Sequence, residues 1–306
     1  MRAPLLAALL LAACATPRAA PLASEAEIAA FEAAPLGPMA SGADWNAPFA
    51  PFNIIDNIYY VGPAGVSSFL IRTPDGLILI DGGLAQSAPI IIANIAALGF
   101  DIRDVKYLLA SHAHFDHAGG LARLQRASGA TFVASAADRA PFEAGRFPYG
   151  PSKDDRFAPL RVDRVVADGE TLSLGGVTLT AHLTPGHTPG CTSWSLPITG
   201  ADGAAHTAFI HCSATTGGQS VAPESYPGMV ADYRTTFART RTISADVFLA
   251  AHGNFFDLAG KRARQIAGDA NAFVDPDALQ RFNAQMEAAF NAELARQQAA
   301  AASPSQ

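Results

Sequence analysis

Residues 108–120 read Leu-Leu-Ala-Ser-His-Ala-His-Phe-Asp-His-Ala-Gly-Gly. Within six positions, this stretch holds four side chains that can bind a metal ion: His112, His114, Asp116 and His117. The mainly apolar run 105–110 comes directly before them and is typical of a buried strand. Gly119 and Gly120 follow and favour a change of element. We therefore expect the cluster on a loop at the end of a core strand, where functional side chains are often placed.

The spacing of these four residues suits two metal ions. In an extended segment, side chains two residues apart point the same way, so His112 and His114 can reach one ion together. Asp116 and His117 follow where the chain must turn, and they can reach a second ion nearby. Neutral imidazole and carboxylate are good zinc ligands. Three of the eight histidines of the chain lie in these six positions, which argues against a polar loop with chance histidines.

Two more histidines complete the expected ligand sets. The loop Thr184-Pro185-Gly186-His187-Thr188-Pro189-Gly190 surrounds one histidine with prolines and glycines, which favours a strained loop that holds this side chain in place. A purely structural histidine is the alternative. The apolar run 247–251 predicts a buried strand that delivers His252. We expect one zinc ion to be bound by His112, His114 and His187, and a second by Asp116, His117 and His252.

The His-x-His-x-Asp-His pattern resembles the motif of the metallo-β-lactamase superfamily. That superfamily includes glyoxalase II, lactonases, and arylsulfatase-like and nuclease-like members, so the motif leaves the substrate open. The resemblance implies an αββα sandwich, an α/β fold in which two βα halves meet with the metal site at their shared edge. The expected elements agree, because each half opens with strands and ends in a strand, a ligand loop and a helix. We assign residues 45–298 to this domain and 299–306 to a disordered tail.

Within the superfamily, the chain most resembles the class B β-lactamases of the third subclass. His117 follows Asp116, whereas the first and second subclasses have a residue there that binds no metal. Ser213 stands where those subclasses carry a zinc-binding cysteine and where glyoxalase II carries a bridging aspartate. The stretches 226–233 and 251–258 also resemble the third subclass.

This resemblance implies roles for four residues. Ser213 and Thr215 would donate hydrogen bonds, as uncharged groups, to the carboxylate of the substrate; a polar turn is the alternative. Asp81 would lie below the metal site and orient ligands and backbone; a simple turn residue is the alternative. Asp116 would also have a catalytic role, because it can orient the attacking hydroxide and relay a proton.

Together, these features predict a zinc-dependent β-lactamase. Two close zinc ions lower the pKa of a water molecule from 15.7 toward ~7 and make hydroxide available at neutral pH. Attack on the β-lactam amide of penicillins, cephalosporins and carbapenems would confer antibiotic resistance. The alternatives are a hydrolase of another ester, thioester or lactone, and a non-catalytic binding module on the same fold.

The N-terminus indicates export. Met1-Arg2 precedes an apolar run, 3–13, which is the outline of a secretory signal peptide over residues 1–20, so we expect a periplasmic protein. The sequence Leu11-Ala12-Ala13-Cys14 resembles a bacterial lipobox and predicts cleavage before a lipidated Cys14; ordinary cleavage near Ala20 is the alternative. Residues 21–44 are rich in Ala and Pro and are interpreted as a linker with room for one short helix.

Export also allows disulfide bonds. Besides Cys14, the chain has two cysteines, Cys191 and Cys212, each beside a predicted strand. We expect these two residues to form a disulfide. Two buried free thiols, or Cys212 as a zinc ligand, are the alternatives.

The composition supports one domain with a sizeable core, since the chain has 306 residues and is 49% hydrophobic. The net charge is −6 and Lys and Arg form no block, so we expect no nucleic-acid partner. Membrane contact is expected only through a lipid anchor at Cys14, because no internal apolar run can span a bilayer. We expect a monomer that acts on a small-molecule β-lactam.

Cap residues and apolar periodicity also predict local elements. Residues 142–157 contain Gly, Pro, Lys and Asp together with phenylalanine and tyrosine, and are predicted to form a surface loop that can border the site. Three histidines are left as structural or surface residues: His182, His206 and His211. Helices are expected at 87–98, 120–128, 233–241 and 275–298.

Overall fold

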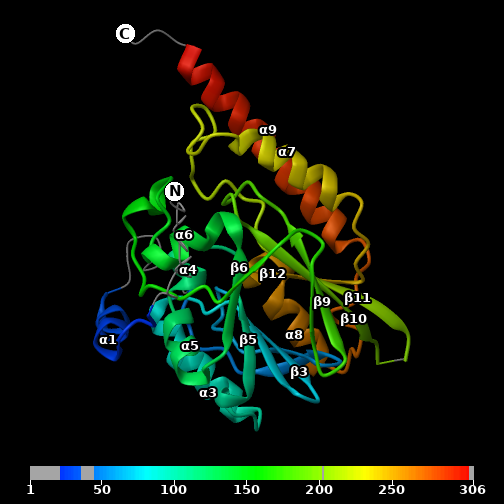
Figure 1. Cartoon of the computed structure of the whole chain (residues 1–306). Helices are drawn as coiled ribbons and strands as arrows, with labels where there is room; N and C mark the ends of the chain where they lie inside the picture. The colour runs from blue at the N-terminus through cyan, green and yellow to red at the C-terminus, as the bar shows by residue number, and fades with distance from the viewer. Residues whose placement is uncertain (1–20, 36–44, 202, 303–306) are drawn as a thin grey trace, which may run out of the picture.

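The computed structural model describes residues 21–35, 45–201 and 203–302. Two β-sheets pack face to face and helices cover their outer faces, so the architecture is the αββα sandwich that the sequence predicts (Figure 1). The expected signal peptide 1–20, with Cys14, lies outside the described residues.

The first sheet contains the strands of the N-terminal half in sequence order. β1 to β4 are antiparallel to their neighbours, whereas β4 to β7 run parallel to one another. Because β4 and β5 are parallel, the residues that follow them emerge at the same edge of the sheet. The strands are β1 (Phe52–Ile55), β2 (Ile58–Tyr60), β3 (Phe69–Thr73), β4 (Gly76–Ile80), β5 (Val105–Leu109), β6 (Thr131–Ser135) and β7 (Arg164–Val166).

The second sheet has the order β12-β11-β10-β9-β8. β8 to β11 are antiparallel to their neighbours, and β12 runs parallel to β11. This parallel pairing places His211 beside Ala250, so the two loops that follow leave from one edge. The strands are β8 (Thr171–Leu174), β9 (Val177–Leu183), β10 (Thr192–Thr199), β11 (Ala205–His211) and β12 (Val247–Ala250).

Helices lie on both outer sides of the sandwich. In Figure 1, α3 and α5 lie beside the first sheet, while α7 and α9 lie side by side on the other half of the molecule. Within the described residues, no helix combines the length and the apolar composition that a membrane span requires. The helices are α1 (Glu25–Ala33), α3 (Ala88–Ala97), α4 (Phe115–Ala118), α5 (Leu121–Ser128), α6 (Ala136–Ala144), α7 (Met229–Thr240), α8 (Leu258–Ile266) and α9 (Ala278–Ala302).

Strand β4 shows how the sequence builds the two-layer core. Ile78 and Ile80 belong to the cluster between the sheets, whereas Leu77 and Leu79 belong to the cluster under the helices of the first half. Because successive side chains of a strand point to opposite faces, a continuous apolar run is required where both faces are covered. Asp81 directly follows this strand and is therefore held at a fixed, buried place.

Helix α1 is the short helix for which the interpretation of residues 21–44 as a linker left room, and it packs against the domain. Ile28 is buried, and the Arg123 guanidinium on α5 pairs with Glu25 and, at 2.8 Å, with Glu32. The buried apolar side chain and the ion pairs hold residues 21–35, the described part of the segment, against the domain.

Two further predictions were wrong in part. Residues 142–144 belong to α6 and the rings of Phe142, Phe147 and Phe157 are buried, although positions such as Arg146 and Pro148 form the exposed loop that was predicted. Helix α9 continues to Ala302, although residues 299–306 were expected to be disordered. The extension consists of alanines, which have the highest helix propensity. The last four residues, 303–306, lie outside the described part of the chain.

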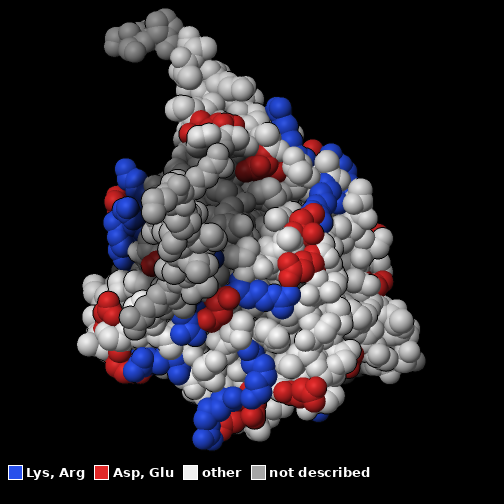
Figure 2. Space-filling view, viewed as in Figure 1, with Lys and Arg blue, Asp and Glu red and all other residues white. Residues whose placement is uncertain are grey.

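On the face of the molecule in Figure 2, basic and acidic residues alternate without a broad patch of one sign. This pattern agrees with a chain that contains 21 basic and 27 acidic residues.

Candidate metal centre

The loop after β5 carries the four polar residues and leads into the short helix α4. His114 is the N-cap of α4 and has extended backbone angles, whereas the chain bends at Ser111 and Ala113. Asp116 and His117 lie on the short helix itself, and both are buried. The change from extended to helical backbone turns the second pair of side chains away from the first pair.

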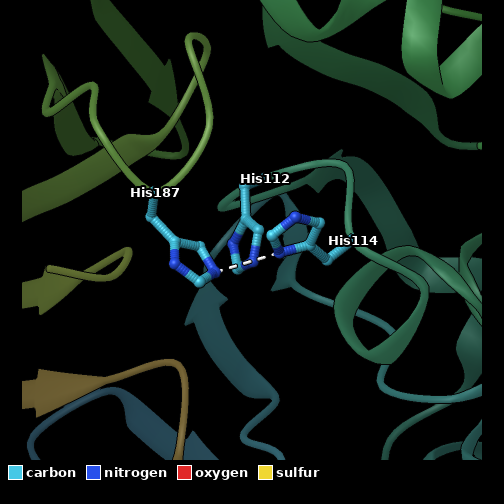
Figure 3. Close-up of side chains that lie close together, drawn as sticks. All are labelled: His112, His114 and His187. Atoms are coloured by element: carbon cyan, nitrogen blue, oxygen red, sulfur yellow. Dashed lines mark hydrogen bonds between the residues drawn. The ribbon is translucent and has the colours of Figure 1, made fainter. Parts of the chain in front are cut away.

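The first ligand set converges in the structure (Figure 3). One ring nitrogen of each of His112, His114 and His187 lies within 4.8 Å of the others, and His114 Nδ1 is 3.0 Å from His187 Nε2. His112 Nε2 is buried and has no hydrogen-bond partner among the described residues. A buried nitrogen without a partner is costly unless it binds a metal ion, so this set fits zinc.

The second set converges next to the first. The separations are 3.3 Å between Asp116 Oδ2 and His117 Nε2, 3.4 Å between Asp116 Oδ2 and His252 Nε2, and 3.2 Å between the two imidazole nitrogens. Ligand bonds of about 2.0–2.1 Å at tetrahedral angles put neighbouring ligand atoms roughly 3.3 Å apart. The three atoms therefore have the spacing of one triangular face of a zinc site.

His187 is held in one orientation by the loop that follows β11. Its Nδ1 lies 2.8 Å from the Thr215 carbonyl oxygen, which also accepts a hydrogen bond of 2.6 Å from the Tyr233 hydroxyl. Gln219 Nε2 donates to the His187 carbonyl at 2.7 Å. With Nδ1 acting as donor, Nε2 keeps its lone pair and faces His114.

Asp81 lies below both ligand sets, in the position that the resemblance implies. Its carboxylate accepts from Ser111 N and from Ser111 Oγ, each at 2.6 Å, and its Oδ2 lies 3.3 Å from His117 Nδ1. Ser111 Oγ is also 2.9 Å from His112 Nδ1. Since Ser111 Oγ donates to Asp81, it accepts from His112 Nδ1 and leaves Nε2 free for metal. The backbone of Asp81 has a left-handed conformation, with φ 62°, which costs conformational free energy in a residue other than glycine. This conformation places the carboxylate under the site.

Burial and neighbouring charges set the protonation of the ligands. Burial lowers the pKa of His112 and of His114 well below the usual value, and that of His187 to about 4, so these rings are neutral at neutral pH. Burial opposes the charged forms of Asp116 and His117 as well, but their mutual attraction outweighs it. The pKa of Asp116 is held well below its usual value and that of His117 is raised to about 10. His117 must therefore lose a proton to bind metal.

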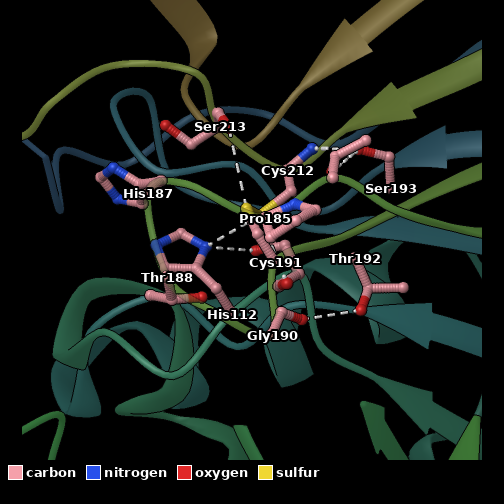
Figure 4. The surroundings of a disulfide bond; sticks show 12 residues. His112, Pro185, His187, Thr188, Gly190, Cys191, Thr192, Ser193, Cys212 and Ser213 are labelled. Carbon is pink, nitrogen blue, oxygen red and sulfur yellow. Dashed lines mark hydrogen bonds between the residues drawn. A yellow bond between two sulfur atoms is a disulfide. The ribbon is translucent and has the colours of Figure 1, made fainter. Parts of the chain in front are cut away.

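The Cys191–Cys212 disulfide is present, with a Cα–Cα distance of 5.9 Å (Figure 4). It ties the end of β11 to the loop that carries His187. Cys212 Sγ lies 3.5 Å from His112 Nδ1, on the side of the ring opposite to the metal-facing nitrogen. Because its sulfur is bonded to Cys191, Cys212 is not a zinc ligand in this structure.

The residues predicted to bind substrate lie beside His187. Ser213 Oγ is 3.3 Å from Thr215 Oγ1, and the Thr215 N–H donates to Ser213 Oγ at 3.4 Å. Gly217 has φ 57°, and a Cβ there would lie 2.9 Å from the His187 ring. Glycine is thus required for the loop to approach this ligand closely.

The sequence analysis did not identify which individual aromatic side chains border the ligands. The Trp45 ring lies 5.3 Å from the His252 ring, and the Phe147 ring lies 4.6 Å from the His114 ring. No spacing in the sequence connects these pairs, because each is formed by tertiary packing.

The three histidines left out of the ligand sets are not part of the site. His182 Nε2 is 2.8 Å from Ser195 Oγ, and His206 lies 3.6 Å from the Asp246 carboxylate. His211 is buried beside the rings of Phe209 and Phe282.

Comparison with protein families identifies this arrangement. The family model described as the metallo-beta-lactamase superfamily matches residues 61–252, which span every proposed ligand. The chain belongs to the metallo-beta-lactamase superfamily. The superfamily and the fold predicted from the motif are thereby confirmed.

Solved structures of the superfamily are similar over most of the chain. BJP-1, a subclass B3 metallo-beta-lactamase of Bradyrhizobium japonicum, is 40% identical, with a TM-score of 0.79 over 84% of this chain and 98% of that protein. FEZ-1 from Legionella gormanii is 38% identical, with a TM-score of 0.79 over 83% and 98%.

Curated relatives match over shorter stretches. A probable metallo-hydrolase of Burkholderia pseudomallei is 37% identical over 112 residues, or 35% of this chain and 36% of that protein. The N-acyl homoserine lactonase AttM of Azorhizobium caulinodans is 32% identical over 155 residues, or 42% of this chain and 58% of that protein. The chain thus covers less than two thirds of the length of these relatives.

Proposed function

We propose that this protein is a zinc-dependent β-lactamase that hydrolyses penicillins, cephalosporins and carbapenems and confers resistance to them. The observation that carries the proposal is the pair of adjacent three-residue sets, each with the donor atoms and spacing of a zinc site. Its similarity to subclass B3 metallo-beta-lactamases over most of the chain supports this substrate class.

The donor atoms fit two zinc ions. Imidazole nitrogen and carboxylate oxygen are suitable ligands, and three protein ligands leave each ion an open position. When bound, two zinc ions supply Lewis acidity for the carbonyl oxygen and an acidified water for attack.

The residues of the chain perform the other tasks of the reaction. Asp116 faces both His117 and His252, so it can orient the attacking water and accept its proton. Ser213 Oγ and Thr215 Oγ1 lie 3.3 Å apart and can turn their O–H groups from each other to the substrate carboxylate. His187 and Tyr233 hold the Thr215 carbonyl and so fix this loop beside the ligands. The rings of Trp45 and Phe147 border the ligands and limit access of bulk water.

A hydrolase of lactones is the second candidate, because a curated relative is named an N-acyl homoserine lactonase. Ser213 argues against it, since it stands where glyoxalase II and its relatives carry a bridging aspartate. Rates with nitrocefin, a penicillin and a carbapenem, compared with rates for an acyl-homoserine lactone and S-lactoylglutathione, test the assignment. The proposal expects turnover of the β-lactams. Turnover of the lactone or thioester alone would establish the second candidate.

The proposal includes export to the periplasm, attachment through Cys14 and action as a monomer. Mass spectrometry of the mature N-terminus tests the lipid, and cell fractionation tests the location. A mature chain without an acyl group that begins near residue 21 would exclude the anchor and retain export.

A further inference from the structure

Asp138 is a buried carboxylate that lies between the two loops of the first ligand set. It belongs to the first turn of α6, and only 1% of its surface is exposed. It does not touch the ligand rings, and the function proposed above gives it no role.

The two oxygens of this carboxylate accept three hydrogen bonds. Oδ2 accepts from the Ala113 N–H at 3.0 Å and from the Thr188 hydroxyl at 2.8 Å, and Oδ1 accepts from the Gly190 N–H at 3.0 Å. Ala113 lies between two ligands of the first set, and Thr188 directly follows the third. One side chain therefore joins the two pieces of backbone on which the first ligand set is mounted.

The junction of β6 and α6 fits closely against the second of these loops, which Figure 4 shows with Thr188 and Gly190. Ser135, the N-cap of α6, donates to the Gly190 carbonyl at 2.7 Å. A Cβ at Gly190 would lie 2.3 Å from Ser135 Oγ and 2.4 Å from Asp138 Cγ. The approach is therefore too close for any other residue, and the position of the loop depends on this contact.

The chemistry of the position favours a carboxylate. All three partners are donors, and an ionised carboxylate has acceptors only. An asparagine would turn an NH₂ group toward at least one donor. Burial of a charge costs free energy, so an apolar residue would serve if packing alone were needed.

We propose that Asp138 is a positioning residue of the first metal site: it fixes the spacing between the loop of His112 and His114 and the loop of His187, and thereby sets the affinity of that site for zinc. The inference rests on the zinc function proposed above. None of the three donors adjoins a ligand of the second set, so the effect is confined to the first ion.

Asp138→Asn is the test, and Asp163→Asn is its matched control. Asp163 also accepts three hydrogen bonds, from Phe132 N, Gln125 Nε2 and Arg161 Nε, but none of these donors adjoins a ligand. Zinc affinity is measured on the full chain, after removal of metal, by competition with a chromophoric chelator. Loss of a group that orients a metal ligand typically weakens binding about 10- to 100-fold. We expect this loss for one of two zinc ions in Asp138→Asn and no loss in Asp163→Asn.

Nitrocefin kinetics separate positioning from a general structural role. With saturating zinc, kcat of Asp138→Asn should return toward the wild-type value, while the zinc concentration for half-maximal rate rises by the same factor as the dissociation constant. Thr188→Val is the second variant, for use if Asp138→Asn does not fold. It removes one donor and keeps the carboxylate, so we expect a smaller loss of zinc affinity.

Three results would overturn the inference. Unchanged zinc affinity in both variants would leave Asp138 a structural residue, even if the melting temperature of the metal-free protein falls. An equal loss in Asp163→Asn would assign the effect to general destabilisation. A wild-type chain that binds no zinc would refute the proposed function itself, whereas two bound zinc ions with normal affinity in Asp138→Asn would refute this inference alone.

Discussion

His211 makes the stability of this protein sensitive to acid. It is the last residue of β11, only 1% exposed, and neither ring nitrogen has a hydrogen-bond partner among the described residues. The rings of Phe209 and Phe282 lie 5.8 and 5.5 Å from it. Such surroundings tolerate a neutral imidazole and oppose its protonation.

The magnitude follows from the difference in pKa between the folded and unfolded states. Burial, with a smaller effect from His187, lowers the pKa of His211 to about 4, whereas a histidine in an unfolded chain titrates near ~6.5. Between these values the unfolded chain binds a proton that the folded chain does not, so the free energy of unfolding falls as the pH falls. Above this window the effect is absent, and below it the loss stays constant. The loss reaches roughly 3 kcal/mol at pH 4.

Urea denaturation of the metal-free protein and of His211→Leu measures this loss. All other titrating groups are common to both proteins, so the difference between their unfolding free energies isolates His211. We expect the variant to gain about 2.5 kcal/mol relative to wild type between pH 7 and pH 4.5. A difference that does not change with pH would refute the reasoning, because it would mean that His211 takes up its proton equally well in the folded chain.

Three other predictions concern the site. Ser213→Ala should raise KM for nitrocefin about tenfold with a smaller effect on kcat, since one hydrogen bond is worth about 1 kcal/mol and one to a charged group more; an unchanged KM would remove Ser213 from the substrate contacts. Asp116→Asn should lower kcat by at least about 100-fold, in the range of general acid–base catalysis, and release one zinc ion; full activity would contradict its role. Reduction of the disulfide, or Cys191→Ser with Cys212→Ser, should lower the unfolding free energy by about 3 kcal/mol for a 21-residue separation, as measured by urea denaturation; equal stability of both forms would show that the crosslink constrains little.

The ligands could be predicted from the sequence because their signals are local. The motif at residues 112–117 directly follows a predicted strand. Its four metal-binding side chains lie within six positions, so short-range backbone geometry is enough to bring them near one another. His187 and His252 each follow a local pattern, a rigid turn and a buried strand. Their convergence depends on the sandwich as a whole, because β5 belongs to the first sheet and β9 and β12 belong to the second.

The supporting contacts could not be predicted, because they join residues that are distant in the chain. The hydrogen bonds of Asp138 span 25 to 52 positions. The resemblance implied the role of Asp81, but not its partner Ser111, which is 30 positions away. Nothing near Trp45 in the sequence indicates that it packs against His252. The composition of residues 142–157 indicated a loop near the site but not which of its rings are buried, because tertiary packing decides this.

The most direct test of the account is a titration of metal-free protein with zinc while nitrocefin hydrolysis is recorded. The two ligand sets predict no hydrolysis without zinc, and a rise with added zinc that saturates at no more than two ions per chain. Hydrolysis that persists in excess chelator, or a protein that saturates with zinc and opens no β-lactam ring, would contradict the proposed function.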